Sequence, residues 1–230
     1  MTGSSSSIAI LGGTFNPPHF GHIQPALTAI DSLGVDKLGL MPCKVPPHKM
    51  LSEIDEKHRI EMTKLACQLD SRIYPELCEL TLPPPSYSAN TLQVLRSLHP
   101  NTALYFLMGE DSFNQLTSWY NWRALTNYCH IVVMRRKGNN SPLPPEQLRW
   151  MEGKCVSREN IANESVAGNI IFLETPFFEI SSTQLRQSLM DYFTANPVAA
   201  RSSEKEIIKW LPKPVFNYIK INRLYHSVTI

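Results

Sequence analysis

The sequence has no long apolar run. No stretch approaches the roughly 18 apolar residues of a membrane span, and the apolar run at residues 8–11 is too short for a signal peptide. The five cysteines are odd in number and form no Cys-x-x-Cys pair, which argues against a disulfide framework and a zinc ribbon. These absences predict a soluble protein of the reducing cytoplasm.

Neither positive nor negative charge is in large excess. Lys and Arg total 22 and Asp and Glu total 20, so the formal net charge is +2, and Arg135-Arg136-Lys137 is the only basic run. Proteins that bind nucleic acid or a membrane surface cluster their basic residues, so we expect neither partner. Assembly into a homo-oligomer is left open. With 230 residues, 43% of them hydrophobic, the chain has enough apolar material for one large core.

Short apolar runs alternate with helical patterns along the chain. The runs are bounded by Gly, Pro or Asn, as strands buried on both faces would be, and lie at 8–11, 37–41, 103–108, 129–134 and 169–173. Apolar residues repeat at helical spacing between them, at 23–33, 60–69 and 92–98. This alternation predicts an α/β fold with a Rossmann-like, doubly wound parallel sheet. Ligands of such sheets bind beyond the carboxyl ends of the strands.

The segment after the first expected strand contains two glycines and two histidines. Gly12 and Gly13 let main-chain N–H groups approach an anion, and a helix that opens at about Gly21 adds N–H donors and a partial positive charge. His19 and His22 stand at the start of this helix, so their imidazoles face the same point. Neither the dinucleotide glycine pattern nor the Gly-Lys-Ser/Thr loop is present. The segment predicts a phosphate site of another kind.

Two other interpretations of His19 and His22 stay open. A spacing of three suits two metal ligands on a helix, and the pair could equally be ordinary surface histidines. We favour phosphate contact, because no third ligand is visible nearby and His19 precedes the helix.

Three hydroxyl residues begin a second helix late in the chain. Ser181, Ser182 and Thr183 stand at its start, and Arg186 lies one turn inside. Together they offer hydroxyls, helix N–H groups and a guanidinium to phosphate oxygens. A plain Ser/Thr cap would explain one hydroxyl but not Arg186.

The first loop resembles the Gly-x-Phe-x-Pro-x-His-x-Gly-His signature of the nucleotidyltransferase superfamily that shares the class I aminoacyl-tRNA synthetase fold. Later segments narrow the resemblance to bacterial nicotinate-nucleotide adenylyltransferases, over residues 8–225. In order, these segments are Val45-Pro46-Pro47-His48-Lys49, Pro85-Ser86-Tyr87-Ser88, Met108-Gly109-Glu110-Asp111-Ser112, Trp119-Tyr120, Arg135-Arg136-Lys137-Gly138 and Ile180-Ser181-Ser182-Thr183-Gln184-Leu185-Arg186. The chain departs at Asn16, where the family often has Asp, at Ser88, where it often has Thr, and at Lys137, where a Pro is common after the arginine.

The resemblance implies transfer of the adenylyl group of ATP to nicotinate mononucleotide, giving nicotinate adenine dinucleotide and pyrophosphate in NAD biosynthesis. It implies a nucleotidyltransferase α/β domain, which we place at 1–190, and a small C-terminal helical extension at 191–230 packed on the same domain. Mg²⁺ would accompany ATP, with no dedicated metal site in the protein.

The resemblance also assigns roles to residues. The catalytic group, which would hold and stabilise phosphate oxygens, is His19, His22 and Arg186. ATP would contact Gly12, Gly13, Thr14, Phe15, Gly109, Asp111, Ser181, Ser182 and Thr183. The mononucleotide would contact His48, Lys49, Tyr87, Ser88 and Trp119. Helix capping would be an ordinary role for Asp111, and core packing for Trp119.

Other functions remain as alternatives. The acceptor could be nicotinamide mononucleotide or phosphopantetheine, although phosphopantetheine enzymes are shorter and lack the Pro-Pro-His segment. A nucleotide-binding regulator without catalysis is a further alternative, which the intact His19, His22 and Arg186 argue against. A class I tRNA synthetase fragment would need a Lys-rich second loop, which is absent here. The polar excursion at 138–168 is interpreted as a spacer, with a lid or an oligomer contact as the alternative.

Overall fold

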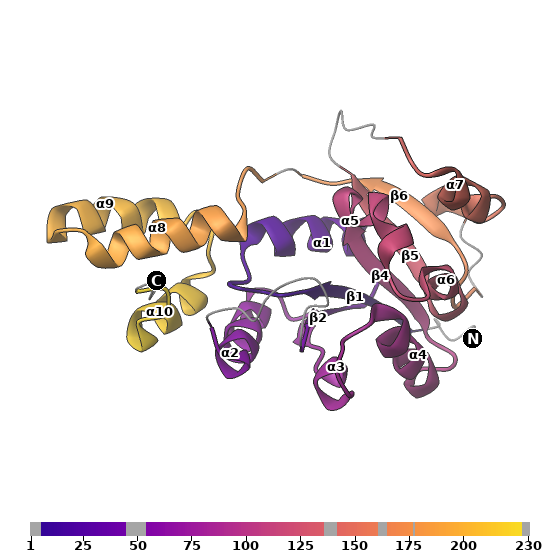
Figure 1. The fold of residues 1–230 in the computed structure, drawn as a ribbon, viewed down its shortest axis with the longest axis horizontal. Coiled ribbons are helices and arrows are strands. Elements are labelled where there is room, and N and C mark those ends of the chain that lie inside the picture. Colours follow the sequence, from indigo (N-terminus) through magenta and orange to yellow (C-terminus); the bar gives the residue numbers. More distant parts are fainter. Residues whose placement is uncertain (1–5, 45–53, 136–141, 161–164, 177, 227–230) are drawn as a thin grey trace.

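The computed structural model describes residues 6–44, 54–135, 142–160, 165–176 and 178–226. Within them, six parallel strands form one sheet in the order β3-β2-β1-β4-β5-β6 (Figure 1). The strands are β1 (Ser7–Gly13), β2 (Lys37–Pro42), β3 (Ile73–Pro75), β4 (Ala103–Gly109), β5 (His130–Arg135) and β6 (Ile170–Glu174). The strand order reverses between β1 and β4, which is where a doubly wound sheet leaves a crevice for ligands.

Helices cover both faces of this sheet. Along β1, Ala9 and Leu11 join the core that includes α1 and α2, whereas Ile10 joins the core that includes α4, because successive strand side chains point to opposite faces. Figure 1 shows α1 and α4 on opposite sides of the sheet. The helices are α1 (Phe20–Leu33), α2 (Glu56–Ala66), α3 (Cys78–Thr81), α4 (Ser88–Leu98), α5 (Glu110–Asn114), α6 (Leu125–Tyr128), α7 (Pro145–Met151), α8 (Ser182–Thr194), α9 (Pro197–Ile207) and α10 (Lys213–Asn222), with 3₁₀ turns η1 (Cys67–Leu69), η2 (Leu116–Ser118), η3 (Trp122–Ala124) and η4 (Arg158–Asn160).

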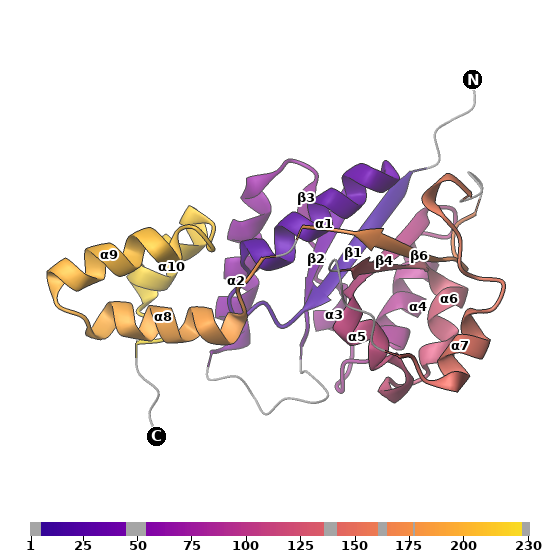
Figure 2. The same cartoon turned by 90° about the horizontal axis from the view of Figure 1, so that it is seen from above.

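The last three helices group at one end of the molecule (Figures 1 and 2). The helix α10 buries Val215, Phe216 and Ile219 in the core that also contains α1 and α2. His58 Nδ1 on α2 lies 2.9 Å from the Tyr218 hydroxyl on α10, which ties the two helices together. The expected boundary between residues 190 and 191 lies inside α8, and the division into a domain and an extension stays a prediction.

The doubly wound parallel sheet is confirmed. The five predicted apolar runs form β1, β2, β4, β5 and β6. The sequence does not predict β3, because this edge strand has only three residues and shows no apolar run. The helix expected near 146–151 is α7, but parts of the 138–168 excursion lie outside the described residues.

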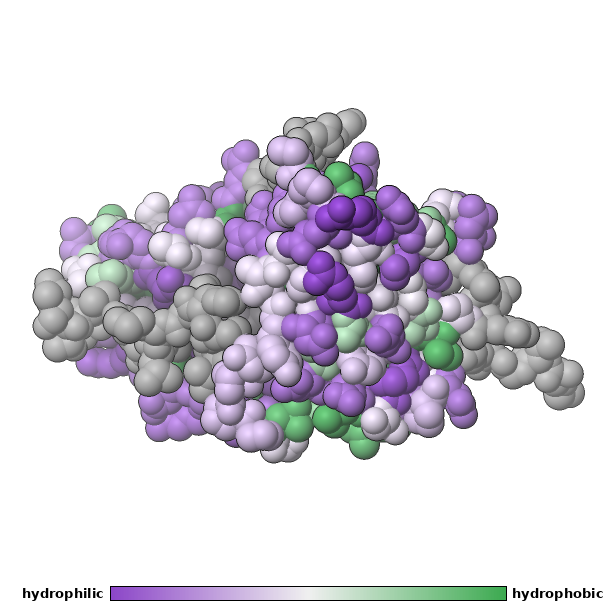
Figure 3. Space-filling model, turned by 45° about the vertical axis from the view of Figure 1, so that its right-hand side comes forward, coloured by the Kyte–Doolittle hydropathy of each residue, from purple (hydrophilic) through white to green (hydrophobic). Residues whose placement is uncertain are grey.

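The surface is mainly polar on the face that Figure 3 displays, where apolar residues form separate green spots among purple and white. Among the helices within the described ranges, none combines the length and the apolar character that crossing a lipid bilayer requires.

Candidate active site

The loop between β1 and α1 is tightly built. Phe15 is 1% exposed and adopts a left-handed backbone conformation with φ of 48°, which bulky residues seldom do. A Cβ on Gly13 would lie 3.1 Å from the Phe15 ring, so a larger residue here would require the buried ring to shift. His19 is the N-cap residue of α1, and the loop therefore presents it where the helix begins.

The two histidines of this loop are stacked. The imidazole centroids of His19 and His22 lie 3.7 Å apart, with 30° between the ring planes. His19 is 3% exposed, and its Nδ1 has no hydrogen-bond partner among the described residues. Burial, and then repulsion from His22, lowers the pKa of His19 to about 3. A neutral imidazole with an available ring nitrogen is suited to an anionic oxygen rather than to proton storage.

The start of α8 lies against this loop, although it is far away in the sequence. His19 Nε2 lies 3.2 Å from Ser182 Oγ, in a hydrogen bond whose donor depends on the tautomer. Arg186 donates from one terminal nitrogen to the Asn16 carbonyl at 3.0 Å and from the other to Thr183 Oγ1 at 3.2 Å. The structure therefore brings together the catalytic group that the sequence proposes.

Ser181 has a structural task in the same segment. Its hydroxyl accepts from the Gln184 backbone N–H, while the Gln184 side chain accepts from the Ser181 backbone N–H, which forms a capping box. The capping role left open above thus applies to Ser181. Ser182, Thr183 and Arg186 are the members that extend toward the first loop or toward each other.

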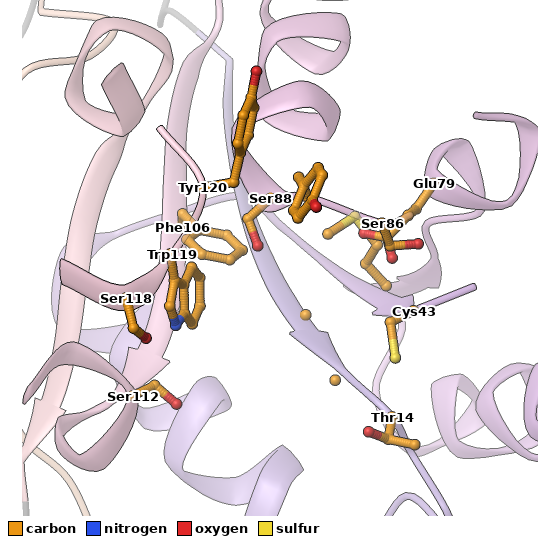
Figure 4. Close-up of a pocket in the computed structure, with 14 residues that line it drawn as sticks. Thr14, Cys43, Glu79, Ser86, Ser88, Phe106, Ser112, Ser118, Trp119 and Tyr120 are labelled. Atoms are coloured by element: carbon orange, nitrogen blue, oxygen red, sulfur yellow. The ribbon is translucent and has the colours of Figure 1, made fainter. Parts of the chain in front are cut away.

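A cavity of about 570 Å³ opens beside the loop, at the carboxyl ends of β1, β2 and β4 (Figure 4). Trp119 and Phe106 stand on one side of it in Figure 4, and Cys43 and Thr14 on the other. The cavity is lined by Gly12, Gly13, Thr14, Met41, Cys43, Glu79, Ser86, Tyr87, Ser88, Phe106, Ser112, Ser118, Trp119 and Tyr120. It thus unites three predicted ATP contacts with three predicted mononucleotide contacts.

The remaining predicted residues do not line this cavity. His19, His22 and the start of α8 are grouped next to it, and Phe15 is core. Gly109 ends β4 and is the N-cap residue of α5, so Asp111 is not that cap but an exposed residue of the first helical turn. His48 and Lys49 lie outside the described residues.

Aromatic side chains supply the apolar walls of the cavity. Tyr87 and Tyr120 stack with ring centroids 4.6 Å apart, and Phe106 meets Trp119 edge to face at 6.4 Å. Trp119 also packs against the core that includes α4, so the packing role applies to it, while its contact with the mononucleotide stays a prediction. Phe106 and Tyr120 are lining residues that the sequence does not assign; the available signals are that Phe106 belongs to the apolar run 103–108 and that Tyr120 follows Trp119.

Two buried charged residues tie together the loops around the cavity. Arg59 on α2 is 3% exposed and donates to the carbonyl oxygens of Thr14, Cys43 and Lys44 at 3.0, 2.8 and 3.3 Å. Glu79 is 4% exposed and accepts from the Lys44 backbone N–H and from Thr91 Oγ1. Burial raises the pKa of Glu79, and the hydrogen bonds oppose that rise. The sequence does not single out either residue, because charged helical residues are normally solvated.

The metal interpretation of the histidines finds no support in the part of the chain that the structure describes. No group of three or more His, Cys, Asp or Glu side chains lies close enough there to hold a metal ion. Three ligands are the minimum for a typical zinc site.

Comparison with known proteins gives a consistent family. Residues 10–188 match the family model described as cytidylyltransferase-like. A protein of Pseudoalteromonas atlantica named "Probable nicotinate-nucleotide adenylyltransferase" is 33% identical over 229 residues, covering 100% of this chain and 99% of the relative. A protein of Shewanella frigidimarina with the same name is 37% identical over 206 residues, covering 87% of this chain and 96% of the relative.

Solved structures agree on the fold. The nicotinic acid mononucleotide adenylyltransferase of Plasmodium falciparum, complexed with NaAD, has a TM-score of 0.66 against this chain at 19% identity. The match covers 96% of this chain and 97% of that one. At this identity the likeness concerns the fold alone.

Proposed function

This chain belongs to the cytidylyltransferase-like family, among its nicotinate-nucleotide adenylyltransferases, and from this premise we propose that it transfers the adenylyl group of ATP to nicotinate mononucleotide. The products are nicotinate adenine dinucleotide and pyrophosphate. The observation that supports this best is the contact of His19 with Ser182, 163 residues later, beside a cavity at the reversal of strand order.

The reaction needs positioning more than proton transfer. The 5′-phosphate of the mononucleotide is already a nucleophile at neutral pH, and it attacks the α-phosphorus of ATP in line while pyrophosphate leaves. Negative charge gathers on the non-bridging oxygens. His19, neutral because its pKa lies at about 3, donates an N–H to these oxygens, together with His22 and the Arg186 guanidinium.

Each of the remaining predicted residues is assigned to one of the two substrates. ATP lies along Gly12, Gly13 and Thr14 toward Ser182 and Thr183, with Phe15 and Ser181 shaping those segments and Gly109 and Asp111 at the adenosine. The nicotinate ring lies against Trp119 and Tyr87, with Ser88 beside its carboxylate and with His48 and Lys49 toward its phosphate. An aromatic wall suits a flat ring, and hydroxyl and backbone donors suit a carboxylate.

A divalent cation, Mg²⁺ in our proposal, would enter on the triphosphate. The described residues offer no group of three acidic or thiol or imidazole ligands, and Mg²⁺ commonly keeps several waters when it binds nucleotides. The ion would supply neutralisation of triphosphate charge. The partners are then small molecules, and assembly into a homo-oligomer and a cytoplasmic location, which the five free thiols suit, stay predictions.

The test is pyrophosphate release from ATP and Mg²⁺ with nicotinate mononucleotide, nicotinamide mononucleotide or phosphopantetheine offered in parallel. We expect strong preference for the first acceptor. Turnover with only another acceptor would overturn the roles of Tyr87 and Trp119 while preserving the phosphate site. Tight ATP binding without turnover would favour a regulator.

A further inference from the structure

Asn16 connects the first loop to the far end of the chain. It is buried, and Arg186 donates to its carbonyl oxygen at 3.0 Å. The hydroxyl of Tyr225, 209 residues later, donates to its side-chain Oδ1 at 2.5 Å. Backbone and side chain of this one loop residue are thus held by two different C-terminal segments.

A backbone hydrogen bond also joins the segment between α9 and α10 to the end of the loop. The backbone N–H of Phe20 donates to the Trp210 carbonyl at 2.8 Å. Phe20 is the first residue of α1, and the N–H groups of a first helical turn have no partner within the helix. Trp210 and Tyr225 therefore restrain the loop on either side of His19, at Phe20 and at Asn16.

The loop needs such restraint. Phe15 adopts the left-handed conformation next to Asn16, and a strained backbone of this kind persists only where its surroundings fix it. Burial raises the pKa of the Tyr225 hydroxyl, so it remains a protonated donor at neutral pH. Its phenol ring is partly buried against the core that includes α1 and α2, which holds the hydroxyl in place.

We propose that Tyr225 is a positioning residue for adenylyl transfer: by holding Asn16, it fixes the loop that aims His19 at the reacting phosphate. This inference rests on the proposed function for its kinetic consequence, but the restraint itself is independent of substrate. The C-terminal segment is then part of the catalytic framework and not only a packing extension.

Tyr218 provides a matched control. Its hydroxyl also ties the C-terminal region to the rest of the protein, but its hydrogen bond goes to His58 on α2 and not to the loop. Tyr225→Phe and Tyr218→Phe each remove one such hydroxyl and keep the ring. We expect Tyr225→Phe to lower kcat about 10- to 100-fold, since a small misplacement of catalytic groups has effects of this size, and Tyr218→Phe to stay within about twofold of the wild type.

Two further measurements separate positioning from general loosening. Hydrogen exchange of the Phe15, Asn16 and His19 amides, measured without substrate, should accelerate in Tyr225→Phe and not in Tyr218→Phe. In an Asn16→Ala background, Tyr225→Phe should have little further effect on kcat, because the two residues act through one bond.

The outcomes are distinguishable. Wild-type kcat in Tyr225→Phe, equal losses in both phenylalanine variants, or full additivity with Asn16→Ala would each overturn the inference. No turnover by the wild type with any acceptor would overturn the proposed function, while the exchange experiment would still decide whether Tyr225 restrains the loop.

Discussion

The buried His19 imidazole lies in ring contact with the half-buried His22 imidazole. Burial lowers the pKa of His19, and repulsion from the His22 ring, whose centroid is 3.7 Å away, acts in the same direction. His19 therefore presents a hydrogen-bond donor without permanent charge. Positive charge at the site comes from Arg186, whose guanidinium is fixed by Asn16 and Thr183.

Replacement of either histidine should cost turnover without unfolding the protein. His19→Ala and His22→Ala each remove a donor to the transition state, and we expect a loss of about 10²–10³ in kcat. Pyrophosphate release, with circular dichroism to verify folding, provides the measurement. Near-native turnover in either variant would remove that residue from the catalytic group.

The depressed pKa of His19 predicts how stability depends on pH. The unfolded chain binds a proton at this residue below pH 6.5, whereas the folded protein does so only below about 3. Stability is therefore lost as the pH falls through that window, at up to about 1.4 kcal/mol per pH unit. His19→Gln should reduce the slope of unfolding free energy against pH by that amount between about pH 6 and pH 4. Denaturant titrations at several pH values measure it, and an unchanged slope contradicts the prediction.

We predict that both terminal nitrogens of the Arg186 guanidinium are needed. Lysine keeps the charge but cannot reach the Asn16 carbonyl, Thr183 and a phosphate together. Arg186→Lys should raise the Michaelis constant for ATP about tenfold, while Arg201→Lys on the exposed side of α9 should not change it. An unchanged constant for Arg186→Lys would argue against direct contact with ATP.

At the scale of elements, the cavity depends on how neighbouring strand ends are joined. The loops after β1 and β2 leave the sheet side by side, and Arg59 binds carbonyl oxygens from both. Glu79 binds the second of these loops to α4 through Lys44 and Thr91. These two buried groups make a single framework out of segments that strand pairing alone leaves separate.

Removal of the Arg59 guanidinium should weaken this framework. Arg59→Met leaves three partly buried carbonyl oxygens without the Arg59 donor, so we expect the free energy of unfolding to fall by about 2–3 kcal/mol. Urea unfolding of Arg59→Met and of a surface control, Arg201→Met, measures the difference. The control should stay within about 0.5 kcal/mol of the wild type. Equal stabilities for the two variants would show that Arg59 is not needed to join the loops.

At the scale of the whole molecule, the cavity and the proposed phosphate-binding residues come from separate parts of the chain. The cavity is lined from β1, β2, β4 and segments that follow β1 to β4, and the residues that we propose to bind phosphate lie at the starts of α1 and α8. Binding of either substrate should therefore stabilise the folded protein, by about 2.7 kcal/mol at 100 times its dissociation constant.

Trp119→Ala should separate the two substrates in a thermal unfolding assay. The variant loses an aromatic wall of the cavity but none of the phosphate contacts, so nicotinate mononucleotide should no longer raise its midpoint while ATP still does. Loss of both shifts would indicate a folding defect and would overturn the assigned role of Trp119.

Prediction from sequence succeeds where a residue's task depends on its near neighbours. The apolar runs yield five of the six strands, the local patterns yield the loop and the start of α8, and the family resemblance groups His19 with Ser182 and Arg186. Prediction fails for β3, which is a short edge strand. It also fails for Arg59 and Glu79, because charged side chains are expected at the surface and only the fold shows that these two are buried.

The sequence alone therefore determined the doubly wound sheet and its family, and it located the two segments that we propose to bind phosphate, because periodicity and local motifs are written in contiguous residues. Beyond the residues that the family resemblance groups, the tertiary structure alone decided which distant residues meet. It placed Phe106 and Tyr120 on the cavity wall and brought Tyr225 to Asn16, 209 residues away. No local pattern in the sequence encodes contacts between segments so far apart.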